Sequence, residues 1–431
     1  MDQNIDQFDP RYLVTLDEIY HSHWTTEKKQ RIAFFREVIK YFWPKGHPTQ
    51  LIQITGTNGK GSVAYYLEQG FKSVSRSGSW TGPHVFDYAE RFHINGQQVA
   101  HDDIVTAYRK IQELYGQFLK EGYEQTSLSF AETGILMTLH LFEQYDVKWG
   151  IMEVGCGGRY TPLMALDMVA CVLTNVGNDH PQSLGTELWQ RAMDKAGIAR
   201  PGVPFFTAEM DAALPYVVKT AEAEGANVIQ IDQKAVEKMR ELQPNAPEFK
   251  LRNLALASQV IRYFHPDLTL AHLLEFMVSK LPGRFANVAP NVIVDVAHNP
   301  DKITRLAEEL SYTYPNQKFC FLLGLTRSRD VRQVFASILK LAKRIVITGA
   351  SYAGQNPEDL AEQLRLDFPD VLVENNPEKA YQQEFKRLEK DDILVLTGSA
   401  YMIDQAINSN PYIRHLNATY GWRVKNNSND Y

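Results

Sequence analysis

Residues 50–62 have the sequence QLIQITGTNGKGS, and this stretch decides the expected fold of the first half of the chain. Gln50 to Thr55 is an apolar run typical of a buried strand, and residues 62–74 have the apolar spacing of a helix. The segment between them is rich in glycine, so the pattern predicts a strand–loop–helix unit. Such a loop lets the backbone turn tightly and present N–H groups to an anion at the positive end of the helix.

We expect this loop to bind phosphate, with Lys60 reaching a terminal phosphate as a point charge and the Ser62 hydroxyl on Mg²⁺. The spacing is unusual, because Gly56 lies only four residues before Lys60, whereas a strict phosphate loop has its first glycine six residues before the lysine. The alternative is structural, since any turn from a strand into a helix needs flexible residues.

Two further predicted strands end in polar loops. Residues 147–154 lead into EVGCGGR (153–159), and residues 169–176 lead into TNVGNDH (174–180). Ligands bind at the carboxyl ends of strands in open α/β sheets, so we expect these loops to face the same crevice as the glycine-rich loop. Glu153 is then a candidate Mg²⁺ ligand, although a Glu at a strand end is more often a solvated cap. His180, taken alone, fits a core histidine and a ligand equally well.

The remaining sequence predicts an α/β protein with two domains. The first ~45 residues have helical spacing, and the segment from Phe206 to Asn253 fits a small sub-lobe. From Asn291 onward, short apolar strands alternate with helices of about 10–15 residues, which predicts a doubly wound parallel sheet with right-handed crossovers. We therefore divide the chain into residues 1–286, a phosphate-loop ATPase-type domain with an N-terminal helical segment, and residues 287–431, a Rossmann-like domain.

The composition excludes several classes of protein. The 431 residues are 44% hydrophobic and 22% charged, as in an ordinary globular chain. With 45 basic against 51 acidic residues, the net charge is −6, and we expect no nucleic-acid partner. Three widely spaced cysteines indicate neither a disulfide framework nor a zinc site, and we find neither a secretion leader nor an 18-residue apolar run. We expect a cytoplasmic protein with no membrane span, and a monomer because no amphipathic seam stands out.

A series of motifs resembles one family. The loop TGTNGKGS resembles the shortened phosphate loop of the Mur ligase superfamily, in its folylpolyglutamate synthase and dihydrofolate synthase branch. Nine further motifs resemble that branch in the same order: TGPHV (81–85), SLSFAE (127–132), EVGCGGR (153–159), TNVGNDH (174–180), DKAGI (194–198), LRNLALA (251–257), LPGR (281–284), DVAHNP (295–300) and TGSAY (397–401). Coincidence does not explain so many collinear motifs.

The resemblance implies a role for each matching residue. For the nucleotide it implies Thr57, Asn58, Gly59, Lys60, Gly61 and Ser62, with Asn253, Arg284 and Asp295 holding adenine, phosphate and ribose. For one or two Mg²⁺ ions it implies Ser62, Glu153 and His180, joined by Lys195 as a carbamylated, carboxylate-like ligand. For the acid and amino-acid substrates it implies Pro83, His84, Glu132, Arg159, His298 and Ser399, and for catalysis Lys60, His180, Lys195 and His298.

Several of these residues have ordinary structural alternatives. Lys195 on a helix is usually a solvated surface lysine, Asn253 is a possible helix-start cap, and Asp295 is a possible strand-end turn residue. The resemblance adds a function that spacing alone does not give.

The implied activity is that of an ADP-forming ligase. ATP converts a carboxylic acid into an acyl phosphate, and an amino acid such as glutamate then attacks the acyl carbon to form an amide. Because water destroys an acyl phosphate, a two-domain chain that closes over it suits this chemistry. The expected partners are small-molecule acid and amino-acid substrates.

Some residues depart from the family pattern near the acid substrate. Thr161, Leu163 and Met164 stand where the family has Asp, Thr and Asn, while Gly82 and Ala131 replace a serine and a phenylalanine. The GxHQ sequence that precedes the family's counterpart of Asn253 is absent as well. These changes favour a divergent substrate, so a non-folate acid is kept as an alternative.

Two other functional classes stay open. A nucleotide-binding regulator without catalysis predicts damaged phosphate or metal residues, whereas Lys60, Ser62 and Glu153 are intact. An ordinary phosphate-loop NTPase or kinase is disfavoured by the shortened loop and by the AHNP motif. Analysis of the reaction product separates the three classes.

Overall fold

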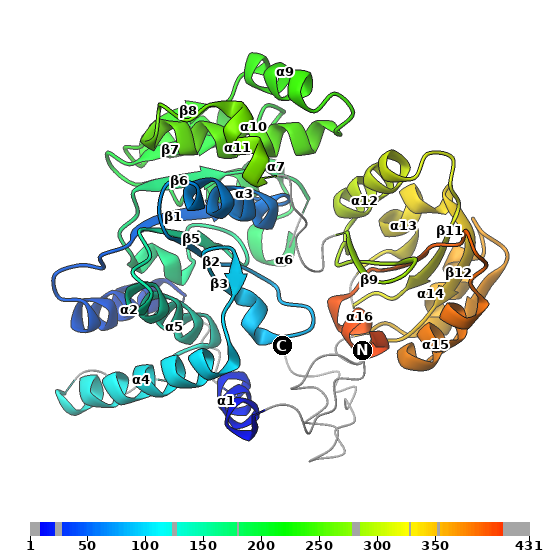
Figure 1. The fold of residues 1–431 in the computed structure, drawn as a ribbon, viewed down its shortest axis with the longest axis horizontal. Coiled ribbons are helices and arrows are strands. Elements are labelled where there is room, and N and C mark those ends of the chain that lie inside the picture. The colour runs from blue at the N-terminus through cyan, green and yellow to red at the C-terminus, as the bar shows by residue number, and fades with distance from the viewer. Residues whose placement is uncertain are drawn as a thin grey trace. The chain divides into compact units, whose positions relative to one another are not determined.

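The structure is a computed structural model, and it describes residues 9–21, 28–122, 127–178, 181–277, 285–326, 329–350 and 354–407. These residues form two compact units (Figure 1). The N-terminal unit comprises residues 9–84 and 89–277, and the C-terminal unit comprises Val85–Tyr88 and the described residues from 285 onward. The expected division between residues 286 and 287 falls after the first residue of β9 (Ala286–Ala289), a strand of the C-terminal sheet.

A mainly parallel sheet forms the centre of the N-terminal unit. Its order within the described ranges is β4-β3-β2-β5-β1-β6-β7-β8, with β3 and β4 antiparallel to their neighbours. The strands are β1 (Gln50–Thr55), β2 (Ser77–Trp80), β3 (Phe92–Ile94), β4 (Gln97–Gln98), β5 (Trp149–Glu153), β6 (Ala170–Leu173), β7 (Pro204–Thr207) and β8 (Asn227–Gln230). The strand expected at residues 50–55 is thereby confirmed.

Helices surround this sheet, and the expected N-terminal helices are present as α1 and α2 (Figure 1). They are α1 (Pro10–Tyr20), α2 (Lys28–Phe42), α3 (Lys60–Lys72), α4 (His101–Lys120), α5 (Phe130–Gln144), α6 (Pro181–Leu184), α7 (Leu188–Ala196), α8 (Leu214–Ala223), α9 (Gln233–Leu242), α10 (Glu248–Phe264) and α11 (Leu270–Met277). Two 3₁₀ turns are η2 (Tyr88–Arg91) and η3 (Pro162–Ala165). Among the helices so described, none has the length and apolar character needed to cross a membrane.

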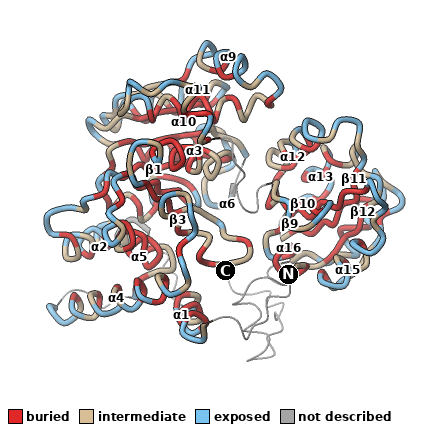
Figure 2. Tube along the Cα trace, in the orientation of Figure 1, coloured by how far each residue is buried: buried red, intermediate tan, exposed pale blue. Residues whose placement is uncertain are grey.

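The core of the N-terminal unit lies where α3, α10 and α11 pack on one face of the sheet (Figure 2). Leu67 of α3, Leu254 of α10 and Leu273 of α11 are buried in this cluster. The sub-lobe expected from Phe206 to Asn253 is therefore wrong: β7 and β8 extend the sheet, and α10 belongs to its core. The sequence pattern does not reveal that α10 belongs to the core, because the polar turns around α9 interrupt the apolar spacing just before α10 begins.

The C-terminal unit is a doubly wound sheet, as expected. Its order within the described ranges is β13-β12-β11-β14-β10-β9, parallel except for β9, which was not expected. The strands are β9, β10 (Val292–Asp295), β11 (Phe319–Leu323), β12 (Ala342–Ile347), β13 (Val371–Val373) and β14 (Leu394–Thr397). The helices are α12 (Pro300–Thr313), α13 (Val331–Leu339), α14 (Pro357–Leu364), α15 (Pro377–Arg387) and α16 (Ala400–Ile407).

Alternate strand residues of this sheet enter two different cores. Ile293 and Val395 pack with α12, α13 and α14, whereas Val294 and Leu396 pack with α15 and α16. Both faces of a parallel sheet are buried in this way, which explains why its strands are apolar throughout rather than alternating with polar residues.

The strand order of the N-terminal sheet places β1 at a topological switch point. The chain leaves β1 through α3 and enters β2 on the far side of β5, and it later leaves β5 and enters β6 on the other side of β1. Connections that diverge on either side of one strand open a crevice at its carboxyl end, where ligands bind in open α/β sheets. The loops that follow β1, β5 and β6 meet at this edge.

Candidate functional site

The loop after β1 is shaped by two glycines. A Cβ on Gly56 (φ +145°) would lie 1.9 Å from Thr174 Oγ1, so a larger residue has no room there. Gly59 (φ +81°) is the N-cap of α3 and supplies no side chain to the N–H groups of the first turn. These N–H groups and the positive end of the helix macrodipole are thus left for an anion. Residues 56–59 are called the glycine loop below.

Two lysines meet at one carbonyl of the glycine loop. Lys60 Nζ donates to Gly56 O at 2.8 Å and to Thr57 O at 3.3 Å. Lys195 Nζ, on α7, donates to the same Gly56 O at 3.3 Å, and its side chain is buried. The surface-lysine alternative for Lys195 is therefore wrong. Lys195 Nζ lies at the glycine loop, and the carbamylation of Lys195 stays a prediction.

A second loop, residues 174–178 after β6, is bonded directly to the glycine loop. Thr57 N donates to Asn175 O at 3.0 Å, and Asn58 N donates to Asn175 Oδ1 at 3.0 Å. In return, Asn175 Nδ2 donates to Asn58 O at 3.1 Å and Gly177 N donates to Thr57 Oγ1 at 2.8 Å. The glycine loop and residues 174–178, far apart in sequence, are thus joined by hydrogen bonds at the ends of β1 and β6, as expected from their positions at strand ends.

Glu153, at the end of β5, lies beside the start of α3. Its Oε2 accepts a hydrogen bond from Gly82 N at 3.0 Å and lies 3.7 Å from where a Cβ on Gly61 would stand. The side chain is buried, so the solvated-cap alternative is wrong. A buried carboxylate next to the first turn of α3, which carries Ser62, is an oxygen donor of the kind that Mg²⁺ prefers. Mg²⁺ keeps several of its waters, so it needs few protein ligands.

The described residues contain no cluster of three metal-ligating side chains of the His, Cys, Asp and Glu types. Two of the expected site residues, His180 and Arg284, lie outside the described residues. The role of His180 at a metal and the role of Arg284 at a phosphate stay predictions.

Asn253, on α10, packs directly against the glycine loop. A Cβ on Gly59 would stand 2.7 Å from both amide atoms of Asn253, Oδ1 and Nδ2. The residue is buried inside α10 rather than at its start, so the helix-cap alternative is wrong. The amide is thereby placed beside the anion-binding end of α3, and its contact with adenine stays a prediction.

Replacing Gly59 by alanine is expected to weaken nucleotide binding by at least about tenfold. The new Cβ would carry the left-handed backbone cost of roughly 1–2 kcal/mol and would also strike the Asn253 amide. Gly46→Ala is a matched control, because Gly46 has φ +82° and a Cβ added there would meet no neighbouring atom within 4 Å. Titration with a fluorescent ADP analogue measures the affinity of each variant. Equal affinities in the two variants would contradict the prediction.

His84, an expected substrate residue, belongs to a polar and aromatic cluster. Arg91 Nε donates to His84 Nδ1 at 2.8 Å, and His84 Nε2 lies 2.6 Å from the Tyr20 hydroxyl. Burial lowers the pKa of His84 well below its usual value of 6.5, and the positive charge of Arg91 lowers it further. The imidazole is therefore neutral at pH 7, with its proton on Nε2. The guanidinium of Arg91 also lies over the Phe130 ring, 5.2 Å from its centroid.

Glu132 is buried and already engaged. It forms an ion pair with Arg31 of α2 through both carboxylate oxygens, and it closes a capping box with Ser129 at the start of α5. These bonds give Glu132 a structural role, and a contact with substrate stays a prediction. Pro83 is exposed.

Arg159 and the altered loop after it pack against the rest of the unit. Arg159 Nη1 pairs with Glu224 Oε1 at 2.7 Å. Leu163, where the family has threonine, is fully buried, and Met164 O accepts a hydrogen bond from Arg36 of α2 at 2.9 Å. The apolar change at residue 163 thus serves packing, which weakens it as evidence for an unusual substrate.

The expected residues of the C-terminal unit gather at the carboxyl ends of β10 and β14, which are paired strands. Asp295 Oδ2 accepts from Phe285 N at 2.8 Å and Oδ1 accepts from Ala297 N at 2.7 Å, as a strand-end turn residue does. His298 Nδ1 lies 2.7 Å from Val296 O. Ser399 is buried, and its Oγ accepts from Met402 N at 3.3 Å in the first turn of α16.

The comparisons with known proteins agree with this geometry. Residues 283–400 match the family described as Mur ligase, glutamate ligase domain. A dihydrofolate synthase/folylpolyglutamate synthase of Buchnera aphidicola subsp. Schizaphis graminum is 28% identical over 375 residues, which are 82% of this chain and 86% of that protein. The resemblance of the sequence motifs to the Mur ligase superfamily, in its folylpolyglutamate and dihydrofolate synthase branch, is confirmed.

A second relative is longer than the chain itself. The probable bifunctional folylpolyglutamate synthase/dihydropteroate synthase of Haloferax volcanii is 23% identical over 403 residues, or 86% of this chain. The chain spans 47% of that protein. The class expected from the sequence motifs, an ATP-dependent acid–amino-acid ligase, is confirmed at the level of the family.

The fold of the chain is also found among solved structures. A bifunctional folylpolyglutamate synthase/dihydrofolate synthase of Yersinia pestis has a TM-score of 0.75 and 23% identity, covering 94% of this chain and 99% of that one. Its structure was determined with AMPPNP and a manganese ion. The expected two-domain α/β fold is thereby confirmed.

Sequence reasoning missed four residues that shape the site. Tyr20 and Arg91 hold His84, whereas Arg191 and Glu209 hold the second loop. None of them lies in a motif with a characteristic spacing. For Arg191 the one available signal is its position four residues before Lys195, which places both on one face of α7.

Proposed function

We propose that the chain is an ATP-dependent ligase that joins a carboxylic acid to an amino acid and releases ADP and phosphate. The observation that carries the proposal is the glycine loop: an uncapped helix start, with Lys60 and Lys195 on one loop carbonyl and Glu153 beside the first turn. Positive charge and free N–H groups suit the phosphates of ATP. Mg²⁺, held by Glu153 and Ser62, would supply charge neutralisation at the phosphates.

The side chains of the N-terminal unit suit the first half of the reaction. Lys60 must leave the carbonyls of Gly56 and Thr57 to contact a terminal phosphate. Lys195 can keep Gly56 O engaged while it does so, and the loop retains its shape. Charge developing on the transferred phosphoryl group is then met by groups already in place, which is how electrostatic preorganisation lowers a barrier.

The residues at the ends of β10 and β14 are proposed to receive the incoming amino acid. His298 and Ser399 lie at the carboxyl edge of the C-terminal sheet, where ligands bind in doubly wound folds. The amine attacks the acyl carbon of the acyl phosphate, the tetrahedral intermediate expels phosphate, and an amide remains.

A folate-type acid is the favoured acceptor, with glutamate as the amino acid. The names of the relatives support it, and the burial of Leu163 removes one reason to expect an unusual acid. The neutral His84, the Arg91 guanidinium and the Phe130 ring form an aromatic and cationic cluster, whose chemistry suits an aromatic acid. A non-folate acid is the second candidate, based on Thr161 and Met164 in the altered loop.

The test is incubation of the protein with ATP, Mg²⁺, L-glutamate and either dihydropteroate or tetrahydrofolate. We expect ADP release that requires both substrates, and an amide product in the mass spectrum. ADP release with other acids but with neither folate compound would favour the second candidate. Nucleotide binding without turnover would indicate a regulator, and a phosphorylated product or phosphate release without the amide would indicate an NTPase or kinase.

A further inference from the structure

We propose that Arg191 and Glu209 are positioning residues for the nucleotide, acting on the glycine loop through the second loop. This inference rests on the proposed function. Neither residue belongs to a motif that suggested the function, and within the described residues no hydrogen bond joins either side chain to the glycine loop. Each of them has instead one hydrogen bond to the second loop, and the two bonded residues of that loop, Val176 and Gly177, are adjacent.

Arg191 is a buried guanidinium whose hydrogen bonds among the described residues go to backbone carbonyls. Its Nε donates to Gly177 O at 2.9 Å, and its Nη1 donates to Thr186 O at 2.7 Å and to Gly185 O at 3.0 Å. The residue is 6% exposed. The planar fork of arginine suits several acceptors at once, which a lysine ammonium does not match.

Glu209, just after β7, is the anionic counterpart of Arg191. Its Oε2 accepts from Val176 N at 2.7 Å, its Oε1 accepts from Asp211 N at 2.8 Å, and the residue is 2% exposed. Hydrogen bonds to charged groups are roughly twice as strong as those between neutral groups. A cation and an anion thus hold opposite backbone groups of neighbouring residues.

Three consecutive peptide units of the second loop are fixed in this way. The unit between residues 175 and 176 is held by Glu209 at its N–H and by Thr57 N at its carbonyl. The unit between residues 176 and 177 donates its N–H to Thr57 Oγ1. The unit between residues 177 and 178 accepts a hydrogen bond from Arg191 at its carbonyl, Gly177 O. The position of Thr57 in the glycine loop therefore depends on a segment that the two charged side chains orient.

The amphipathicity of α7 supports a functional reason for this arrangement. Its buried face carries Arg191 and Lys195, one turn apart, whereas Trp189 and Met193 are 44% and 43% exposed. Burying two long polar side chains while leaving apolar side chains in water is unfavourable for stability. Both buried side chains donate to carbonyls of the two loops, so α7 aligns these loops at the expense of ordinary packing.

The experiment measures nucleotide affinity in Arg191→Met, Arg191→Lys and Glu209→Gln, using a fluorescent ADP analogue with Mg²⁺. We expect the dissociation constant to rise at least tenfold in Arg191→Met, to recover partly in Arg191→Lys, and to rise severalfold in Glu209→Gln. The KM for ATP should rise by the same factors, with little change in the KM for glutamate. Unchanged affinity in folded Arg191→Met and Glu209→Gln would overturn the proposal.

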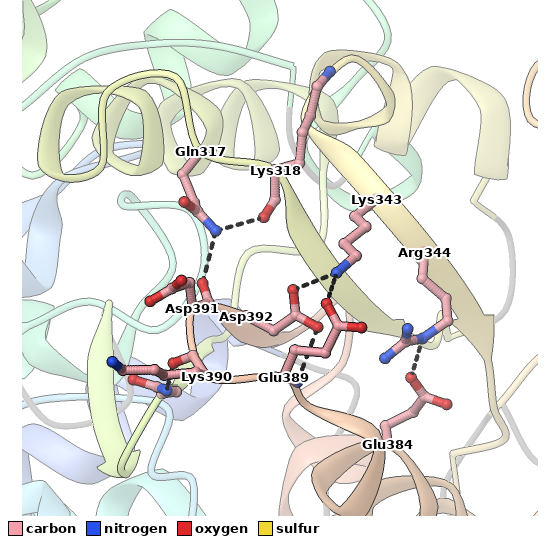
Figure 3. Close-up of polar contacts among 10 residues, drawn as sticks. Gln317, Lys318, Lys343, Arg344, Glu384, Glu389, Lys390, Asp391 and Asp392 are labelled. Carbon is pink, nitrogen blue, oxygen red and sulfur yellow. Dashed lines mark hydrogen bonds and ion pairs between the residues drawn. The ribbon is translucent and has the colours of Figure 1, made fainter.

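Arg344→Met is the control for a general loss of stability. Arg344 binds Glu384 in the C-terminal unit, as Figure 3 shows, and no hydrogen bond or ion pair of the described residues joins it to either loop. Its loss should lower the melting temperature without changing the dissociation constant. An equal loss of affinity in this variant would mean that stability explains the effect, and it would overturn the proposal.

A double-mutant cycle tests the route through Thr57. We compare the fold increase in the dissociation constant of the Thr57→Val, Arg191→Met double variant with the product of the fold increases of the two single variants. If Arg191 acts through the second loop, the increase in the double variant should be smaller than that product. A fold increase in the double variant equal to that product would overturn the proposal that Arg191 acts through Thr57. Failure of the unaltered protein to bind the analogue would instead contradict the proposed function, so the two failures are distinguishable.

Discussion

Lys60→Ala is expected to reduce the rate of ADP formation by about 10²–10³-fold, the usual effect of removing one preorganised electrostatic group. The glycine loop should keep its shape, because Lys195 Nζ still donates to Gly56 O after Lys60 is removed. The variant therefore loses a mobile positive charge rather than the fold. The measurement is kcat at saturating substrates, together with a thermal unfolding curve that confirms the folded state.

Lys72→Ala provides the control for Lys60→Ala. Lys72 is an exposed lysine in the last turn of the same helix, α3, and its removal changes the net charge by the same amount. We expect its kcat to stay close to that of the unaltered protein. A folded Lys60→Ala protein with near-normal kcat would contradict the assignment of Lys60 to the transferred phosphate.

Glu153→Gln is expected to lower kcat by about 10²-fold or more and to raise the Mg²⁺ concentration needed for half-maximal activity. Glutamine has the size of glutamate, and its carbonyl oxygen can still accept the hydrogen bond from Gly82 N. The substitution therefore removes one negative charge beside the first turn of α3 and leaves the packing in place. A Mg²⁺ titration of the rate measures both effects at once.

Glu384→Gln is the matched control for Glu153→Gln. Glu384 is also buried, and it pairs with Arg344 in the C-terminal unit, as Figure 3 shows. It pairs with Arg387 as well. Its neutralisation should lower stability, since it leaves the partly buried guanidinium of Arg344 without its anion, and it should not shift the Mg²⁺ requirement. An unchanged rate and Mg²⁺ requirement in Glu153→Gln would count against a metal role for that carboxylate.

Elements with strong local patterns could be predicted from the sequence. Gln50–Thr55 is a run of apolar residues before a glycine-rich turn, and its strand has those bounds in the structure. Short strands such as SGSW at Ser77–Trp80 and ANVA at Ala286–Ala289 were missed, because they lack a distinctive apolar pattern. They become strands because neighbouring strands supply hydrogen-bond partners, which is a non-local effect.

The positions of the site residues could be predicted where the family resemblance supplied them. Whether a charged or polar side chain of the site is buried was harder to predict. Spacing alone left a solvated cap open as the alternative for Glu153 and favoured a surface residue for Lys195, but both side chains are buried at the glycine loop. The hydrophobic pattern of α7 gives no hint of this, since Trp189 and Met193 are on its exposed side. A helix can bury basic side chains only when other segments bring hydrogen-bond acceptors to them, as the two loops do for Arg191 and Lys195.

The amino-acid sequence by itself determined that β1 is followed by a tight glycine turn and a helix, because glycine content and apolar periodicity are local properties. It also determined the alternation of strands and helices that makes the second sheet parallel except for β9. Only the tertiary structure decided which buried polar side chains hold that turn in place, directly or through the second loop. Arg191, Lys195 and Glu209 come from segments remote from it in the chain, and the free energy of burying each depends on the backbone groups that folding places around it.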